Sequence, residues 1–258
     1  MFKYIYGPVS SWRLGISLGI DLLSGEEKIC SFDCSYCQVG KTGVFSLKRK
    51  IYVPTVEVTR EIEQLPADIA IDYYTFSGRG EPTLAANLGE VAAWIHMNRN
   101  GKCALLTNGA LIGDPKLEKE LMEIDLISLK MDAFSEGIFK KVNRPAEGIL
   151  ITEIRKHMSE FRKRYSGTFG IQIMVLRENI PDMADIAEFC RKLKPDIVHL
   201  NTPLRDSPVL PVTPEELEKV ELLFAGLPVV SVYRATRKKV QPLTPEETLK
   251  KRGRESDE

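Results

Sequence analysis

The chain has 258 residues and a formal net charge of +0, which excludes a polycation that binds nucleic acid through a global positive field. Its hydrophobic residues (43%) and charged residues (28%) are near the globular average, which excludes wholesale disorder. No apolar run reaches the roughly 18 residues of a membrane span, and no signal peptide opens the sequence, so we expect a cytoplasmic protein without membrane contact.

Strand-like segments alternate with segments of helical period along the chain. We expect strands over residues 14–23, 72–77, 103–107, 126–131, 169–175 and 196–201. We expect helices at about residues 55–65, 85–99, 115–123, 147–165, 181–193 and 214–224, the last opened by Thr213-Pro-Glu-Glu. This alternation predicts right-handed crossovers and a parallel sheet, in an α/β fold that is either doubly wound or an incomplete barrel.

Strand parity favours the barrel. Odd-numbered residues of the fourth strand are aliphatic, whereas Ser128, Lys130 and Asp132 share its other face. Gln172 lies on the corresponding face of the fifth strand. A doubly wound sheet would bury both faces under helices and read as more uniformly apolar. The sequence therefore predicts an incomplete TIM-type (β/α)6 barrel with a partly polar interior.

The domain boundaries follow from composition. We expect residues 1–232 to form the barrel domain, with residues 41–54 as an excursion from its first strand–helix loop. Residues 233–258 are basic and poor in apolar side chains, so we expect a C-terminal tail that is mobile at its end.

Three of the five cysteines lie within eight positions, in Cys30-Ser-Phe-Asp-Cys34-Ser-Tyr-Cys37. An odd number of cysteines in a chain without an export signal argues against a disulfide framework. Three thiolates with this spacing can hold three irons of a [4Fe–4S] cube and leave the fourth iron open, as catalysis at a metal requires. Structural zinc needs a fourth ligand, and neither Cys103 nor Cys190 has a close partner in the sequence.

The triplet, with Tyr36 before its third cysteine, resembles the radical S-adenosylmethionine (SAM) superfamily. The segment Ser77-Gly-Arg-Gly-Glu-Pro-Thr83 resembles that superfamily's glycine-rich segment. Residues 6–21 and Val142-Asn-Arg-Pro145 resemble a subgroup that includes the wyosine-forming tRNA enzymes. Those enzymes carry further N-terminal cysteines for a second cluster. No cysteine precedes Cys30 here, so the sequence indicates a relative that lacks the second cluster.

The resemblance implies two cofactors, a [4Fe–4S] cluster and SAM. By this resemblance Cys30, Cys34 and Cys37 ligate the cluster and Tyr36 lies beside the adenine of SAM. It also implies a low-potential electron donor, such as flavodoxin or ferredoxin.

The glycine-rich segment is expected to hold the methionine end of SAM. The resemblance assigns Gly80, Glu81 and Pro82 to its amino group, through backbone carbonyl and carboxylate acceptors. Arg79 stands where the family often has glycine, so Gly78 or Gly80 must allow the close backbone approach. Arg79 itself is either an anion contact or a solvated charge.

Further candidates follow from the rule that active sites of βα barrels lie at the C-terminal ends of the strands. Lys130 is the candidate for the SAM carboxylate and Asp132 for the ribose hydroxyls, with an internal Lys–Asp ion pair as the alternative. Gln172 contacts SAM or substrate, or is an interior amide. Asn108 and Asn201 end two other strands; Asn201 contacts adenine or ribose, or caps a loop.

These features together predict a radical SAM iron–sulfur oxidoreductase or lyase. In such enzymes SAM is cleaved to methionine and a 5′-deoxyadenosyl radical that abstracts hydrogen from a substrate, here a small molecule, a protein or tRNA. The alternatives are a glycyl-radical-enzyme activase, a tRNA-modifying enzyme, and an electron-transfer scaffold whose cluster does not bind SAM.

Overall fold

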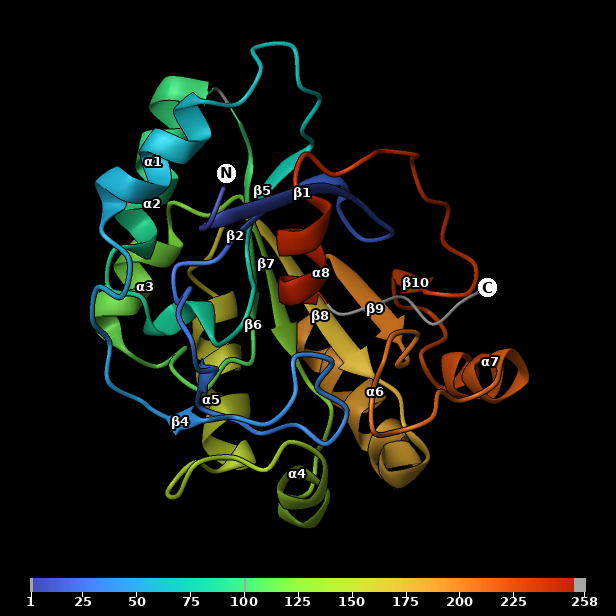
Figure 1. Ribbon diagram of the computed structural model, residues 1–258. Helices are drawn as coiled ribbons and strands as arrows, with labels where there is room; N and C mark the ends of the chain where they lie inside the picture. Colours follow the sequence, from blue (N-terminus) through green and yellow to red (C-terminus); the bar gives the residue numbers. More distant parts are fainter. Residues whose placement is uncertain (1, 100, 253–258) are drawn as a thin grey trace.

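The computed structural model describes residues 2–99 and 101–252. At its centre, one sheet curls into an open half-barrel (Figure 1). Its strands, in spatial order, are β1 (Ile5–Ser11), β2 (Gly15–Ile20), β5 (Tyr73–Phe76), β6 (Cys103–Thr107), β7 (Leu126–Lys130), β8 (Thr168–Met174), β9 (Ile197–Asn201) and β10 (Val229–Ser231). Strand β1 is antiparallel to β2, and every later pair is parallel. The predicted incomplete barrel is confirmed.

Helices follow the parallel strands and cover the outer face of the sheet (Figure 1). They are α1 (Thr55–Glu63), α2 (Leu88–Arg99), α3 (Pro115–Leu121), α5 (Ile151–Arg162), α6 (Met183–Leu193) and α7 (Pro214–Leu223). Helix α7 begins as its sequence predicts, because Thr213 and Glu216 form a capping box and Pro214 is the first helical residue. The short helices α4 (Glu136–Val142), η1 (Pro82–Leu84) and η2 (Arg177–Asp182) lie in the loops after the strands and were not predicted.

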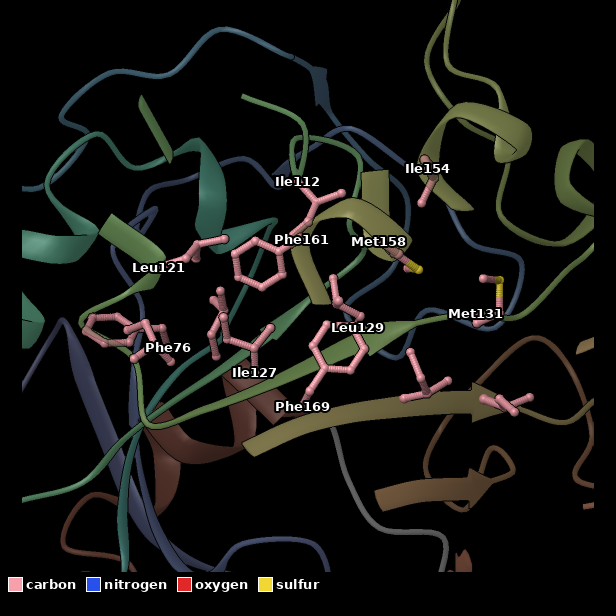
Figure 2. Packing of buried hydrophobic residues seen from close by; sticks show 14 of the residues in the cluster. Phe76, Ile112, Leu121, Ile127, Leu129, Met131, Ile154, Met158, Phe161 and Phe169 are labelled. Atoms are coloured by element: carbon pink, nitrogen blue, oxygen red, sulfur yellow. The ribbon is translucent and has the colours of Figure 1, made fainter. Parts of the chain in front are cut away.

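The apolar core lies between the sheet and these helices. On β7 the side chains of Ile127 and Leu129 are fully buried and face α5, whose Met158 and Phe161 lie over them, and Met131 just after the strand is fully buried in the same core (Figure 2). The residues between them face the interior of the half-barrel, as the strand parity predicts. The inner surface of the sheet therefore carries polar side chains such as Ser128 and Lys130, together with apolar ones such as Leu106 and Met174.

The start of the chain differs from the prediction of a single strand over residues 14–23. The sheet begins instead with an antiparallel hairpin of β1 and β2, joined by a turn over residues 12–14, after which Gly15 starts β2 in a left-handed conformation (φ +65°). The ring of Tyr6 lies across Gly19, where an added Cβ would meet it at 2.0 Å. This hairpin carries Trp12 and Arg13 at its tip.

The segment expected as a basic tail contains helix α8 (Pro245–Arg252), which lies against β1 (Figure 1). Thr248 Oγ1 accepts a hydrogen bond from the amide of Gly7 at 3.0 Å. Lys251 Nζ lies 2.8 Å from the carboxylate of Asp21, and both side chains are buried. Residues 253–258, the end of that tail, lie outside the described residues.

The excursion after the first parallel strand forms a small parallel ribbon of β3 (Ile29–Cys30) and β4 (Val44–Phe45). It places the cysteine loop at the C-terminal ends of the barrel strands. Within the described part of the chain, none of the helices has both the length and the apolar character needed to cross a bilayer.

Candidate active site

A cavity of about 530 Å³ opens at the C-terminal ends of the parallel strands. Most of the residues predicted from the sequence line it: Cys30, Cys34, Tyr36, Cys37, Gly78, Gly80, Glu81, Asn108, Lys130, Gln172 and Asn201. Pro82 and Asp132 are buried behind its wall. The fold therefore brings together residues from the ends of five strands, β5 to β9, and from the cysteine loop.

The three cysteines of the loop are free thiols, and each sulfur has one nitrogen donor from outside the triplet. These pairs are Lys28 Nζ with Cys37 Sγ (3.1 Å), Asn143 Nδ2 with Cys34 Sγ (3.6 Å) and Asn108 Nδ2 with Cys30 Sγ (3.8 Å). Hydrogen bonds of this kind stabilise sulfur that carries negative charge. The donor set therefore fits a thiolate-bound iron–sulfur cluster.

In the metal-free protein, burial disfavours the charged thiolate form of the loop cysteines. It raises the pKa of Cys30 to about 12, with Glu81 and Cys34 adding to the effect, and it also raises the pKa of Cys34. A bound cation reverses this balance, because metal binding to cysteine releases the proton.

The motif at residues 142–145 supports the cysteine loop from behind. The amide of Ser35 donates to the carbonyl of Val142 at 2.8 Å, and the amide of Asp33 donates to the carbonyl of Asn143 at 3.1 Å. Phe32 pairs with Pro145 in an isolated β-bridge. The motif that the sequence offered only as a resemblance thus has a structural role, which is to fix the cysteine loop on the end of helix α4.

Glu81 is buried, and hydrogen bonds occupy its carboxylate. Oε1 accepts from the hydroxyls of Thr83 (2.7 Å) and Thr107 (2.6 Å), and Oε2 accepts from the amide of Asn108 (2.8 Å). Burial raises the pKa of Glu81 although these hydrogen bonds oppose it. Glu81 therefore ties the loops after β5 and β6 together.

The glycine-rich loop lies directly against the cysteine strand. A Cβ on Gly80 would stand 2.0 Å from the carbonyl oxygen of Ile29, and Gly78 has a φ of +143° that L side chains rarely adopt. Arg79 donates to the carbonyls of Gly25 (2.8 Å) and Glu26 (3.1 Å). Both glycines are thus required by the backbone, and Arg79 fastens the loop to the neighbouring turn.

Tyr36, Lys130 and Asp132 form one hydrogen-bonded group. The hydroxyl of Tyr36 donates to Asp132, and Lys130 Nζ lies 2.5 Å from that hydroxyl and 4.4 Å from the ring centre. Asp132 is fully buried and also accepts from Asn143 Nδ2 and the amide of Met174, both at 2.8 Å. Lys130 keeps 26% of its side chain exposed, so it alone of the Lys–Asp pair faces the cavity.

The charges in this group follow from their surroundings. Burial raises the pKa of Tyr36 well above its usual value, and Asp132 adds to the shift. Burial opposes the charge on Lys130, but Asp132 and the cysteine sulfurs outweigh it, so the pKa of Lys130 is raised. These shifts describe a neutral Tyr36 phenol that lies between the Lys130 ammonium and the Asp132 carboxylate.

The remaining predicted residues have different surroundings. Gln172 Oε1 accepts a hydrogen bond from Arg13 at 2.6 Å. Asn108 Nδ2 also donates to Ser31 Oγ at 2.8 Å, so Asn108 supports the cysteine loop. Asn201 lines the cavity at the end of β9.

Several cavity residues were not predicted from the sequence. Lys28 precedes the triplet, and its contact with Cys37 has no signal beyond its charge. Arg13 reaches the cavity from the hairpin tip, and Lys251 and Arg252 reach it from helix α8. Arg13, Lys251 and Arg252 come from segments far from the cysteine loop in the chain, and spacing within one motif does not reveal such neighbours.

A second group of ligand-type side chains, His96, Cys103 and Asp125, lies at the opposite ends of the strands. Asp125 accepts from the amide of Cys103 at 2.6 Å and contacts His96 Nε2 at 2.9 Å. Burial raises the pKa of Cys103 far above its usual value. Asp125 therefore serves to join β6, β7 and α2.

Comparison with known proteins identifies a matching family model and two similar relatives. The family model of the radical SAM superfamily matches residues 28–190. UPF0026 protein slr1464 of Synechocystis sp. is 38% identical over 209 residues, which cover 81% of this chain and 78% of that protein. UPF0026 protein MJ1312 of Methanocaldococcus jannaschii is 32% identical over 226 residues, covering 85% of this chain and 70% of that protein.

Solved structures share the fold at low identity. Streptococcus suis SuiB bound to the precursor peptide SuiA superposes with a TM-score of 0.64 at 13% identity, over 84% of this chain. A radical SAM methyltransferase from Sphaerobacter thermophilus gives a TM-score of 0.60 at 16% identity, over 83% of this chain and 65% of its own. The match covers 48% of SuiB, so this chain spans about half the length of that protein.

Proposed function

This chain belongs to the radical SAM superfamily, and from that premise we propose that it binds a [4Fe–4S] cluster on Cys30, Cys34 and Cys37 and cleaves SAM reductively. When bound and reduced, the cluster supplies the electron that converts SAM to methionine and a 5′-deoxyadenosyl radical, which abstracts a hydrogen atom from the substrate. The observation that carries the proposal is the set of three sulfurs beside one cavity, each with its own N–H donor.

The methionine end of SAM belongs between the glycine-rich loop and Lys130. Lys130 is the cation of its ion pair that faces the cavity, so it binds the carboxylate. Backbone carbonyls of Gly78 and Gly80, with Pro82 closing the loop, accept from the amino group. Glu81, whose oxygens are already occupied, acts as a positioning residue for this loop.

The nucleoside end of SAM belongs toward Tyr36 and Asn201. The ring of Tyr36 is fixed by Asp132 and lies beside the space for the adenine. Asn201, at the end of β9, offers an amide to the ribose or the base. Asp132 is buried, so we assign it to positioning Tyr36 and Asn143, and Asn108 to positioning Cys30.

The reductant is proposed to be flavodoxin or ferredoxin, docking beside the cysteine loop. The adjacent excursion exposes Phe45 (49%) and Ile51 (57%) among lysines 41, 48 and 50. An apolar patch with a cationic rim suits a transient partner of opposite charge. Three thiols kept free for a cluster also suit the reducing cytoplasm, where we place the protein.

Anaerobic reconstitution with iron and sulfide, followed by reduction with dithionite in the presence of SAM, tests the proposal. We expect visible iron–sulfur absorption and formation of 5′-deoxyadenosine. Cys34→Ala removes one of the three ligands and is expected to abolish both signals. Cys103→Ala is the matched control, because Cys103 is a buried thiol at the other end of the strands.

An intact cluster that never yields 5′-deoxyadenosine would contradict the enzymatic assignment and favour the electron-transfer scaffold. The substrate stays open among a small molecule, a glycyl-radical partner protein and tRNA. Deuterium transfer from a labelled candidate into 5′-deoxyadenosine identifies it.

A further inference from the structure

The cavity extends past the residues assigned to SAM toward the tip of the β1–β2 hairpin and helix α8. Its lining is strongly cationic, with Lys28, Lys130, Lys251, Arg13, Arg79, Arg205, Arg237 and Arg252. Among the described lining residues the acidic one is Glu81, whose carboxylate is occupied by neighbouring donors. This excess of positive charge lies inside a protein whose overall charge balances.

Arg13 is the centre of this cationic region. It is partly buried, donates from one guanidinium nitrogen to Gln172 Oε1 at 2.6 Å, and lies 5.2 Å from the ring of Trp12. Among the described residues, its Nε has no hydrogen-bond partner and no carboxylate forms an ion pair with it. Burial, reinforced by Arg205 and Arg252, lowers the pKa of Arg13 to about 9.

Two serine hydroxyls also belong to the lining of the cavity. Ser128 on β7 is buried and Ser10 on β1 is half-buried; both line the cavity, and the buried Oγ of each has no hydrogen-bond partner among the described residues. The strand register places Lys130 opposite Gln172 and Ser128 opposite Gly170, so Ser128 lies one layer deeper than Lys130. Lys130 and Ser128 therefore line the cavity at different depths.

A partly buried cation without an anionic partner is costly, and so are buried hydroxyls without partners. An oxyanion satisfies both, because it accepts from guanidinium and from hydroxyl groups at once. Helix α8 also holds this end of the chamber in place, through the contact of Arg205 with the carbonyl of Arg252 (3.4 Å) and the Lys251–Asp21 ion pair.

We propose that the end of the cavity near the hairpin tip and helix α8 binds a phosphate or carboxylate group of the substrate, with Arg13 as the principal contact and Ser128 as a second donor. The inference rests on the proposed function, because it leaves Lys130 and the glycine-rich loop to SAM and assigns Arg13 and Ser128 to the substrate. It defines the substrate class as a small molecule that carries an oxyanion.

The test measures how fast phenylglyoxal modifies individual arginines in the full-length, cluster-loaded protein saturated with SAM and kept oxidised. Peptide mass spectrometry follows Arg13 and, as a matched control, Arg155, which stacks on Phe134 (3.6 Å) on helix α5 outside the cavity. Methyl phosphate and acetate are the two probes. A probe at ten times its dissociation constant is expected to slow modification of Arg13 about tenfold and to leave Arg155 unchanged.

Calorimetric titration of the same probe supplies the second measurement. Arg13→Gln is expected to weaken binding about tenfold or more, Arg13→Lys to recover part of the affinity, and Arg155→Gln to change nothing. Retained cluster absorption and circular dichroism show that each variant is folded. Protection by methyl phosphate alone assigns a phosphate, and protection by acetate alone assigns a carboxylate.

Three outcomes overturn the inference. They are protection of Arg13 by SAM alone, absence of protection by either probe, and protection by tRNA when both small probes fail. If the oxyanion protects Arg13 but reduction with SAM yields no 5′-deoxyadenosine, the proposed function fails while the oxyanion site stands.

Discussion

The ammonium of Lys28 lies 3.1 Å from the sulfur of Cys37 and 2.8 Å from the carbonyl oxygen of Gly40. It is buried, so its charge acts on the sulfur with little screening. A cation beside a cluster ligand favours the reduced, more negative state of the cluster.

Lys28→Met is therefore expected to lower the midpoint potential of the cluster by about 50 mV, the equivalent of roughly 1 kcal/mol of lost stabilisation. A potentiometric titration followed by electron paramagnetic resonance measures this. Lys41→Met, an exposed lysine on the same loop, serves as the control and should leave the potential unchanged. Equal potentials in the Lys28 and Lys41 variants would remove Lys28 from this role.

Gly80→Ala is expected to disrupt the contact between the glycine-rich loop and the cysteine strand. The new Cβ would stand 2.0 Å from the carbonyl oxygen of Ile29, which also accepts from the amide of Glu81. We expect at least about 2 kcal/mol of lost stability in urea unfolding and at least about tenfold weaker SAM binding.

Gly137→Ala is the matched control for that substitution. Gly137 lies in helix α4 with open space at its Cβ position, so alanine should raise stability by about 0.5–1 kcal/mol. Unchanged SAM affinity in Gly80→Ala would show that the loop does not hold SAM.

Tyr36→Phe removes the hydroxyl that links Lys130 to Asp132. The buried carboxylate loses one donor, so we expect a loss of about 1–3 kcal/mol in the free energy of unfolding, together with weaker SAM binding as Lys130 loses its fixed position. Urea unfolding and calorimetric titration measure the two effects. Tyr4→Phe, outside the cavity, should stay within about 0.5 kcal/mol of wild type.

The lowered pKa of His199 predicts that the folded protein loses stability in acid. His199 is buried against the edge of Trp12, and burial, with a smaller effect of Arg13, lowers its pKa to about 3 from the ordinary 6.5. Between these values the unfolded chain binds the proton and the folded chain does not, so stability is full above pH 6.5 and falls as the pH drops toward 3.

At pH 5 this residue should cost about 2 kcal/mol relative to pH 8. Urea unfolding of the cluster-free protein at both pH values measures the cost, and His199→Leu should remove that share of the pH dependence. The same loss in the variant would place the acid sensitivity elsewhere.

The barrel was predictable because its strands alternate residue by residue. The fully buried Leu129 and Ile173 are outward-facing, and Lys130 and Gln172 are inward-facing, so parity alone separated the covered face from the site face. Strand β1 lacks such a pattern, since Gly7-Pro8 and two serines interrupt it. Its place in the sheet depends on pairing with β2, which periodicity does not encode.

Helix α8 was missed although a signal was present. The same Thr-Pro-Glu-Glu sequence that opens α7 at Thr213 recurs at Thr244, directly before α8. The helix buries Thr248 and Lys251 instead of an apolar stripe, so a search for hydrophobic periodicity does not detect it.

For the candidate site, spacing identified the sulfur ligands because they lie on one loop. Their nitrogen donors Asn108 and Asn143 come from 78 and 109 positions away from the cysteines they contact, and only the fold brings them there.

The contact of Gly7 with Thr248 joins residues 241 positions apart, so the wall of the chamber at α8 is among the last parts of the molecule to form. During synthesis on the ribosome, the cysteine loop emerges long before this helix exists. Lys251 and Arg252 of that helix line the cavity, so this part of the cavity wall is completed only when the helix docks on β1.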